Sequence, residues 1–209
     1  MKPRFVVMVS GNGTNLQVLV DAVGNGTVEA SIVLVIASNI EAYALKRAEA
    51  AGIPTLAMPY RRDPTLGNVE SRRVYDRRIA ELILPYKPDY IFLLGWMRVL
   101  SGEFIKRFPG KILNLHPALP GAFPGTHAIE RAWDACARGE ISESGVMVHS
   151  VPDEGVDSGP VIDFERVAMW RDESLDAFEE RMHSTEHALV VRAATRLVSA
   201  IIPGTKENY

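Results

Sequence analysis

Short, mostly apolar runs alternate with segments of helical period through the first half of the chain. The runs cover residues 5–9, 32–37, 55–58, 90–94 and 112–115. A run without polar alternation is typical of a strand buried on both faces, as in parallel sheets. The intervals 14–23, 43–51 and 71–84 place apolar residues at helical spacing. This alternation predicts an α/β fold with a Rossmann-like, open, mostly parallel twisted sheet and helices on both faces.

The period changes in the second half of the chain. A helix is predicted over 128–138, and it is followed by apolar strands over 145–151 and 161–167 that a turn-rich segment joins. These two strands predict an antiparallel C-terminal extension of the sheet. Residues 175–202 predict one long C-terminal helix, whose apolar stripe consists of Phe178, Met182, Leu189 and Ala193.

Composition excludes several classes of protein. A chain with 47% hydrophobic residues and a net charge of -3 is typical of a soluble globular protein and argues against a nucleic-acid partner. No stretch reaches the roughly 18 apolar residues that cross a bilayer, and no secretory leader is recognisable. Cys136 is the single cysteine, so no intramolecular disulfide forms, which favours a reducing cytoplasm.

Unusual segments follow three of the predicted strands, at 10–15, 95–100 and 114–125. Ligands of open α/β sheets bind beyond the carboxyl ends of the strands. In the first segment, Gly11 and Gly13 allow backbone N–H groups to approach an anion at the start of a helix, which we expect Thr14 or Asn15 to cap. The segment matches neither the dinucleotide nor the Walker pattern. It fits a single phosphate monoester, and a tight strand-to-helix turn is the alternative.

Asn114 and His116 stand two residues apart at the end of the fifth predicted strand. Alternation along a strand points both side chains to the same side. An amide donor beside an imidazole suits stabilisation of an oxyanion and transfer of a proton. The alternative is a histidine that is satisfied by a loop carbonyl. Pro117 and the Pro- and Gly-rich residues up to Gly125 are typical of a loop that walls a pocket.

Acidic residues gather between His149 and Pro160, at Asp153, Glu154 and Asp157. Carboxylates near a histidine suit a proton relay or a cation site, although the spacing of a calcium-binding EF-hand is absent. An acidic surface turn is the alternative. Six arginines at 61, 62, 72, 73, 77 and 78 indicate a solvated helix face, of which one or two could hold an acidic ligand.

His183, Glu186 and His187 match the inverted zinc-peptidase pattern H-x-x-E-H. Catalytic zinc needs a third protein ligand. The only acidic residue downstream is Glu207, close to the C-terminus. We therefore predict no metal, and interpret Glu186 as a polar group where a long helix passes a binding site.

Taken together, these segments resemble the phosphoribosylglycinamide formyltransferases, a family of folate-dependent enzymes. The likeness runs from residue 5 to about residue 198, and its motifs occur in order: SGNGTNL, GWMRVL, NLHP, PG, GVMVHSV, DEGVDSGPVI and EH. The resemblance implies the formyltransferase fold. It also implies transfer of a formyl group from 10-formyltetrahydrofolate, as co-substrate, to the amine of glycinamide ribonucleotide.

The resemblance also implies roles for individual residues. The ribonucleotide would be bound by Gly11, Asn12, Gly13, Thr14, Asn15 and, at the ribose, Glu186. Folate would contact Met97, Arg98, Val99, Leu100 and Asp153, with Arg72 near its glutamate end. The catalytic group would consist of Asn114, His116 and Asp157, oriented by His149. We expect Asp157 to raise the pKa of His116 through its opposite charge.

The expected organisation is a single domain over 1–209, with a phosphate- and ribonucleotide-binding half at 1–100 and a folate-binding and catalytic half at 101–209. The expected partners are small molecules, without nucleic acid or membrane, and the chain is expected to act as a monomer or homodimer. In the family, the equivalents of His149 and Asp157 are usually seven residues apart. Here they are eight apart, with Pro152 as the extra residue, a difference that a loop can absorb.

Other functions compatible with this fold differ in their second substrate. A formyltransferase acting on a nucleotide amino sugar is one alternative. The methionyl-tRNA enzyme carries a further C-terminal domain, and a formyltetrahydrofolate hydrolase carries an N-terminal regulatory domain, for which we expect no room here. A nucleotide-binding module without catalysis would keep the 11–15 segment but would have no use for Asn114, His116 and Asp157.

Overall fold

A seven-stranded sheet runs through the molecule in the order β3-β2-β1-β4-β5-β6-β7, in a computed structural model that describes residues 1–201. Neighbouring strands from β3 to β5 are parallel, whereas β6 pairs antiparallel with both β5 and β7. The strands are β1 (Arg4–Val9), β2 (Ser31–Ala37), β3 (Thr55–Ala57), β4 (Tyr90–Leu93), β5 (Ile112–His116), β6 (Glu143–Ser150) and β7 (Val161–Ala168). The predicted sheet and its antiparallel extension are therefore confirmed.

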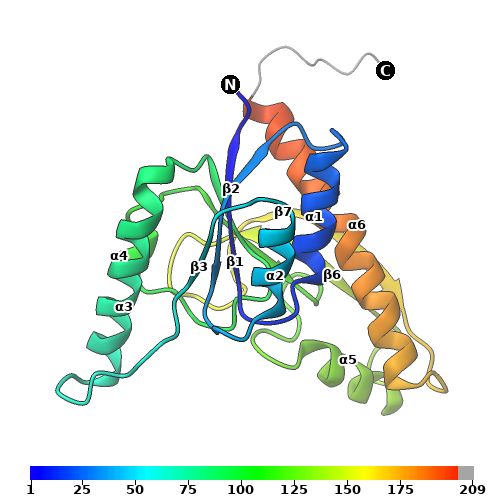
Figure 1. Ribbon diagram of the computed structural model, residues 1–209. Helices are drawn as coiled ribbons and strands as arrows, with labels where there is room; N and C mark the ends of the chain where they lie inside the picture. Colours follow the sequence, from blue (N-terminus) through cyan, green and yellow to red (C-terminus); the bar gives the residue numbers. More distant parts are fainter. Residues whose placement is uncertain (202–209) are drawn as a thin grey trace.

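Helices cover both faces of this sheet, as predicted (Figure 1). They are α1 (Thr14–Gly24), α2 (Tyr43–Ala50), α3 (Asn68–Ile83), α4 (Gly102–Ile105), α5 (Ala128–Ala137) and α6 (Leu175–Ile201), with a 3-10 turn, η1, at Leu84–Tyr86. The long C-terminal helix is confirmed up to Ile201, and Ile202 lies outside the described residues. The four residues of α4 and the 3-10 turn were not predicted, because neither is long enough to display a helical period.

Two apolar clusters form the core, one on each face of the sheet. Phe5, Val7 and Val9 of β1 belong to the cluster under α1, α2, α5 and α6. Val6 and Met8 of the same strand belong to the cluster under α3 and α4. A strand buried on both sides cannot alternate with polar residues, which is why β1 appears in the sequence as an uninterrupted apolar run.

Helix α6 is fixed to the antiparallel edge of the sheet by charged contacts. Arg192 donates from Nε to Asp163 Oδ2 at 2.7 Å and from Nη1 to Glu165 Oε2 at 2.7 Å, and both carboxylates belong to β7. Asp163 is buried. The predicted apolar stripe of α6 is confirmed, since Phe178, Met182, Leu189 and Ala193 are all buried.

Candidate active site

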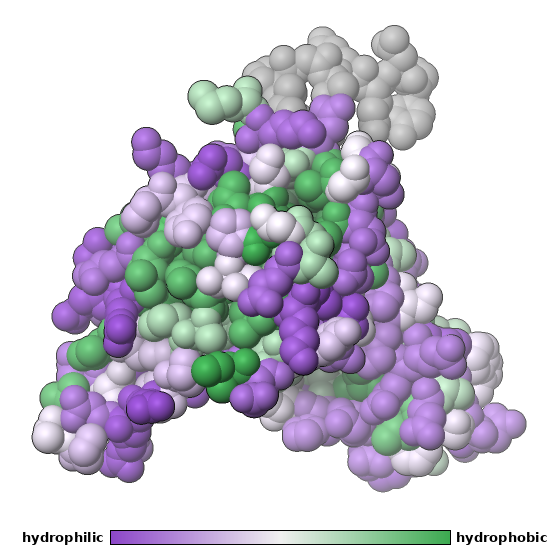
Figure 2. All heavy atoms as spheres, in the orientation of Figure 1, coloured by the Kyte–Doolittle hydropathy of each residue, from purple (hydrophilic) through white to green (hydrophobic). Residues whose placement is uncertain are grey.

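A cavity of about 680 Å³ opens at the carboxyl ends of the parallel strands. Its walls are the segments that follow β1, β4 and β5, together with residues 149–157 and part of α6. Figure 2 shows the molecular surface notched at this end, between the α3 side and the α5 side. All three segments that the sequence indicated thus line one cavity.

The 11–15 loop follows β1 and includes the first two residues of α1, and every one of its residues lines this cavity. Neither Thr14 nor Asn15 caps α1, contrary to our prediction. Gly13 occupies the N-cap position in the left-handed region, with φ at 75°, and no side chain bonds to the helix end. A Cβ at Gly13 would lie 2.5 Å from the Cβ of Ala44. Glycine is therefore required here by both the backbone conformation and the contact with α2.

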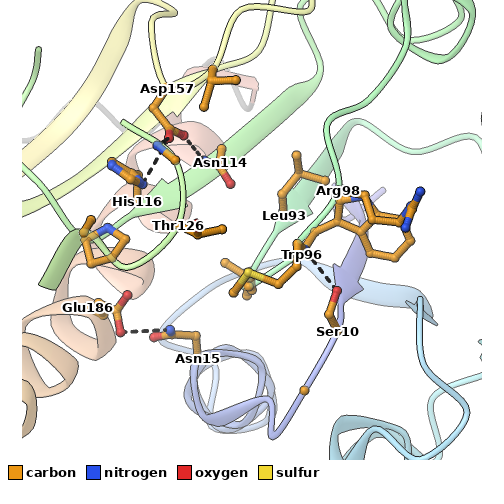
Figure 3. A pocket seen from close by; sticks show the side chains of 18 of the residues that line it. Ser10, Asn15, Leu93, Trp96, Arg98, Asn114, His116, Thr126, Asp157 and Glu186 are labelled. Carbon is orange, nitrogen blue, oxygen red and sulfur yellow. Dashed lines mark hydrogen bonds and ion pairs between the residues drawn. The ribbon is translucent and has the colours of Figure 1, made fainter. Parts of the chain in front are cut away.

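Glu186 reaches the same end of the cavity from α6. Its side chain is buried, and its Oε2 accepts a hydrogen bond from Asn15 Nδ2 at 3.3 Å (Figure 3). His183, one turn earlier, contacts the same oxygen through Nδ1 at 2.8 Å. This contact raises the pKa of His183, while partial burial opposes the shift. The loop and α6 therefore form one polar surface, in which Glu186 joins the two.

Asp157 stands at the centre of the polar cluster at the other end of the cavity. Its Oδ1 accepts a hydrogen bond from Asn114 Nδ2 at 2.9 Å, and its Oδ2 accepts one from the backbone N–H of Gly125 at 2.8 Å (Figure 3). His116 Nδ1 lies 3.3 Å from Oδ2, and His149 Nε2 lies 3.4 Å from Oδ1. The longer spacing between His149 and Asp157 therefore leaves the carboxylate facing all of these groups.

The amide of Asn114 is engaged on both of its N–H groups. One donates to Asp157, and the other lies 3.2 Å from Nε2 of His149. His149 Nδ1 donates to the carbonyl of Ser150 at 2.9 Å, and its Nε2 faces both the Asn114 amide and Asp157. His149 thus contacts the amide that we expect it to orient. The amide must exchange one of these contacts before it can donate to a substrate oxygen.

His116 lies between two acceptors. Its Nε2 donates to the carbonyl of Phe123 at 3.1 Å, and its Nδ1 faces Asp157. The histidine contacts a loop carbonyl, as one alternative from the sequence predicted, and it also belongs to the polar cluster. Only the doubly protonated ring can donate to both acceptors at once.

The pKa of His116 differs from our expectation. Asp157 does favour the charged ring, but burial is the larger effect, and it lowers the pKa of His116 below its ordinary value. The expected effect of Asp157 is therefore present, but burial outweighs it and the net shift of the His116 pKa is downward. For Asp157, burial alone would raise the pKa, yet the hydrogen bonds from His149 and Gly125 and the charge of His116 outweigh it and lower that pKa. The cluster thus pairs a carboxylate with a lowered pKa and an imidazole whose pKa is also lowered.

Backbone strain is concentrated around this cluster. Among residues 1–201, four residues other than glycine adopt positive φ, and three of them, Phe123, His127 and Asp157, line or support the cavity. Such conformations cost about 1–3 kcal/mol each and persist where surrounding contacts fix them. For Asp157, at a φ of 50°, those contacts are the ones to Asn114, His116 and Gly125.

The 97–100 segment forms the apolar wall of the cavity. Met97 and Val99 are 69% and 41% exposed at its rim, Leu100 is buried, and Asp153 lies on the facing loop. The guanidinium of Arg98 stacks 3.7 Å from the ring centre of Tyr60. Large exposed apolar side chains beside a cavity are the surface that a flat aromatic ligand would cover.

Arg72 does not line the cavity, and it forms an ion pair with Glu154. Glu154 Oε1 also accepts the backbone N–H of Gly102 at 2.8 Å, so this carboxylate holds the 151–157 loop against α3 and α4. Of the six arginines around α3, Arg72 is half-buried and the other five are exposed, as the solvated-face interpretation predicts.

Three contributors were missed by the sequence reasoning. The Phe123 carbonyl and the Gly125 N–H hold His116 and Asp157, and their only sequence signal is the Pro- and Gly-rich loop. Ser10 accepts the backbone N–H of Met97 at 3.0 Å and a hydrogen bond from Ser38 at 2.7 Å (Figure 3). The hydroxyl of Ser10 thereby joins the end of β1 to the 97–100 segment.

Two negative findings concern residues 1–201 alone. No group of three or more His, Cys, Asp or Glu side chains there is arranged to hold a metal ion, and His183 instead pairs with Glu186. In the same part of the chain, no helix has both the length and the apolar character needed to cross a membrane.

Known proteins are similar to this chain in sequence and fold. The formyl transferase family model matches residues 3–194. The phosphoribosylglycinamide formyltransferase of Schizosaccharomyces pombe is 40% identical, and the match covers 95% of this chain and 99% of the relative. That of Escherichia coli is 36% identical, and the match covers 89% of this chain and 82% of the relative. The crystal structure of the Bacillus halodurans phosphoribosylglycinamide formyltransferase superposes with a TM-score of 0.84 at 29% identity, covering 95% of this chain and 97% of that one. With a fold, a cavity and a full-length sequence match that agree, the chain belongs to the formyl transferase family, among the phosphoribosylglycinamide formyltransferases.

Proposed function

We propose that this chain transfers the formyl group of 10-formyltetrahydrofolate to the primary amine of glycinamide ribonucleotide, in purine synthesis. The products are N-formylglycinamide ribonucleotide and tetrahydrofolate. The observation that carries the proposal is the placement of three surfaces in one cavity: the 11–15 loop, the Asp157 cluster and the apolar 97–100 segment. They match a phosphate, a reacting carbonyl and a flat heterocycle, respectively.

The ribonucleotide fits the end formed by the 11–15 loop and α6. Backbone N–H groups at a helix N-terminus suit its phosphate, and the buried carboxylate of Glu186 suits ribose hydroxyls, which are hydrogen-bond donors. The folate fits the 97–100 segment, with Asp153 opposite and Arg72 toward its glutamate end. In the proposed division at residue 100, the first half mainly binds the ribonucleotide and the second mainly binds folate. Glu186 is one exception, because it belongs to the second half and contacts Asn15 in the first.

The chemistry consists of one bond formed and one bond broken at the formyl carbon. The amine nitrogen bonds to this carbon, the bond to N10 of the folate breaks, and a proton passes from the amine to the leaving nitrogen. Asn114 donates to the formyl oxygen as negative charge develops on it, having exchanged its contact with Asp157 or His149. Removal of one such donor typically costs about 10²–10³ in rate.

His116 and Asp157 are the groups that donate and accept protons in this reaction. The lowered pKa of His116 makes its charged ring a stronger acid, which suits donation toward the developing oxyanion. Asp157 remains ionised because its own pKa is lowered, so it accepts the amine proton only transiently and passes it on. His149 acts through Asn114 and Asp157, which it contacts, and the proposed steps require neither a metal nor a covalent intermediate on the chain.

The direct test mixes the protein with glycinamide ribonucleotide and 10-formyltetrahydrofolate and follows tetrahydrofolate release by absorbance. Release that depends on the ribonucleotide supports the proposal. Release with water alone, accompanied by formate, would indicate a hydrolase, and release only with a nucleotide amino sugar would indicate a sugar formyltransferase. Binding without turnover would overturn catalysis. We further propose action in the cytoplasm as a monomer or homodimer on small molecules alone.

A further inference from the structure

The carbonyl groups of Gly11, Asn12 and Gly13 are turned away from the cavity, toward donors of α1 and α2. Gly11 O accepts the N–H of Ala44 at 3.2 Å, Asn12 O accepts Nε of Arg47 at 2.9 Å, and Gly13 O accepts the N–H of Gln17 at 3.0 Å. In a planar trans peptide the N–H points opposite to the carbonyl. The N–H groups of residues 12, 13 and 14 are therefore turned toward the cavity, and none has a hydrogen-bond acceptor within residues 1–201.

Arg47 is the one side chain among these three donors. Besides its bond to Asn12 O, it donates from Nη2 to Asn12 Oδ1 at 3.0 Å and from Nη1 to Gln17 Oε1 at 3.3 Å. Its guanidinium lies 4.9 Å from the ring centre of Tyr43, which supports it from α2. A planar fork with several fixed donors can hold both the backbone and the side chain of Asn12, whereas a lysine offers a single point charge.

Arg47 does not itself line the cavity. Its hydrogen bonds therefore reach a ligand only through Asn12, whereas its charge acts at longer range. By fixing the Asn12 carbonyl, the guanidinium fixes the N–H of Gly13, since the two belong to the same peptide group. It also places a permanent positive charge behind the loop, on the side opposite the expected anion.

We propose that Arg47 is a positioning residue for phosphate binding, which holds the peptide between Asn12 and Gly13 so that its N–H faces the phosphate of the ribonucleotide. This inference rests on the proposed function, and it assigns phosphate affinity to a residue of α2 outside the cavity. The consequence is that phosphate recognition and formyl transfer depend on separate parts of the molecule.

The test compares Arg47→Gln, Arg47→Lys and Lys46→Gln. Lys46 is an exposed neighbour on α2 that contacts the ring of Tyr43 and not the loop, so it controls for loss of one charge. For Arg47→Gln we expect a KM for glycinamide ribonucleotide about tenfold higher or more, because hydrogen bonds to charged groups are worth that much. We expect kcat and the KM for folate to change less than about twofold on the same reasoning, since these contacts do not touch the Asp157 cluster.

Calorimetry with ribose 5-phosphate provides a readout that needs no turnover. We expect Arg47→Gln to weaken this ligand by the same factor as glycinamide ribonucleotide, Lys46→Gln to leave it unchanged, and Arg47→Lys to restore only part of the affinity. Unchanged binding in Arg47→Gln, or full recovery in Arg47→Lys, would overturn the positioning role. Should Arg47→Gln fail to fold in urea denaturation, the folded Arg47→Lys variant must still show the partial loss. Failure of the proposed reaction would appear separately, as absent turnover in the unmodified protein that still binds ribose 5-phosphate.

Discussion

The two ends of the cavity differ in how their polar groups are used. At the Asp157 end, the carboxylate, the Asn114 amide and both nitrogens of His116 already contact one another or the loop backbone. At the other end, the N–H groups of residues 12 to 14 have no acceptor within the described residues. The first end is assembled before any ligand arrives and must exchange contacts to react. The second offers donors that no protein group within residues 1–201 satisfies.

This difference follows from what each end has to do. An anion is bound by donors that point at it and need not move, so a rigid loop with unpaired N–H groups suits a phosphate. A reacting carbonyl acquires charge only during the reaction, and the groups that meet it must stay solvated or paired beforehand. We therefore expect substitutions at the Asp157 end to lower kcat, and substitutions in the 11–15 loop to raise the KM for the ribonucleotide.

Replacement of Asp157 by asparagine should produce the largest effect. The variant loses the charge that faces His116 and keeps a single acceptor oxygen for two donors, so we expect kcat to fall by about 10²–10⁴. Affinity for ribose 5-phosphate should be retained, because the carboxylate is not part of the 11–15 loop. Steady-state kinetics and calorimetry measure the two quantities. A loss of phosphate affinity equal to the loss of kcat would show that the two ends are not separate.

Gly13→Ala should weaken the ribonucleotide more than the folate. The new methyl group would lie 2.5 Å from the Cβ of Ala44, at a φ of 75° that L residues rarely adopt. We expect the KM for the ribonucleotide to rise about tenfold and the free energy of unfolding to fall by about 1–2 kcal/mol.

Gly26→Ala is the matched control for this change, because Gly26 has a φ of 84° and a Cβ added there would meet no atom within 4 Å. Gly26→Ala introduces similar backbone strain, but the new methyl group clashes with no atom and lies outside the cavity. If both variants raise the KM equally, the contact between Gly13 and α2 has no role in binding.

Glu154→Gln should have a smaller effect, confined to folate. The change removes the ion pair with Arg72 and weakens the bond from Gly102 that holds the 151–157 loop. Because exposed ion pairs contribute at most about 1 kcal/mol, the KM for folate should rise less than about fivefold, with the KM for ribonucleotide unchanged. Glu140→Gln, which removes an exposed pair with Arg138 elsewhere, is the control. A decrease in the KM for folate would contradict a supporting role for Glu154.

His183→Gln should have the smallest effect, and it should depend on pH. Glu186 raises the pKa of His183 above 6.5, so the contact stabilises the fold fully below pH 6.5 and is lost as pH rises through the raised pKa. The half-exposed ring limits the effect to less than about 1 kcal/mol. Urea denaturation should show the variant less stable at pH 6 and equal to the unmodified protein at pH 9. A difference in stability that persists at pH 9 would show that it arises from packing and not from the ion pair with Glu186.

The sequence was sufficient for the sheet because its apolar runs are too short for helices and alternate with segments of helical period. It also indicated the three segments of the cavity, since glycines and polar residues follow these strands at their carboxyl ends, where ligands of open α/β sheets bind. It did not predict that both N–H groups of Asn114 are engaged, or that burial outweighs Asp157 at His116. Those facts depend on where the loop backbone at Phe123 and Gly125 lies, which no local pattern encodes.

The attachment of α6 to β7 has a consequence for the far surface of the molecule. Glu186 and Arg192 lie six positions apart on one rigid helix, which corresponds to about 9 Å along its axis. The depth at which Glu186 enters the cavity is therefore set in part by Asp163 and Glu165, on the outermost strand of the sheet. The amino acids of a strand that does not line this cavity are thus constrained by how the sugar is recognised.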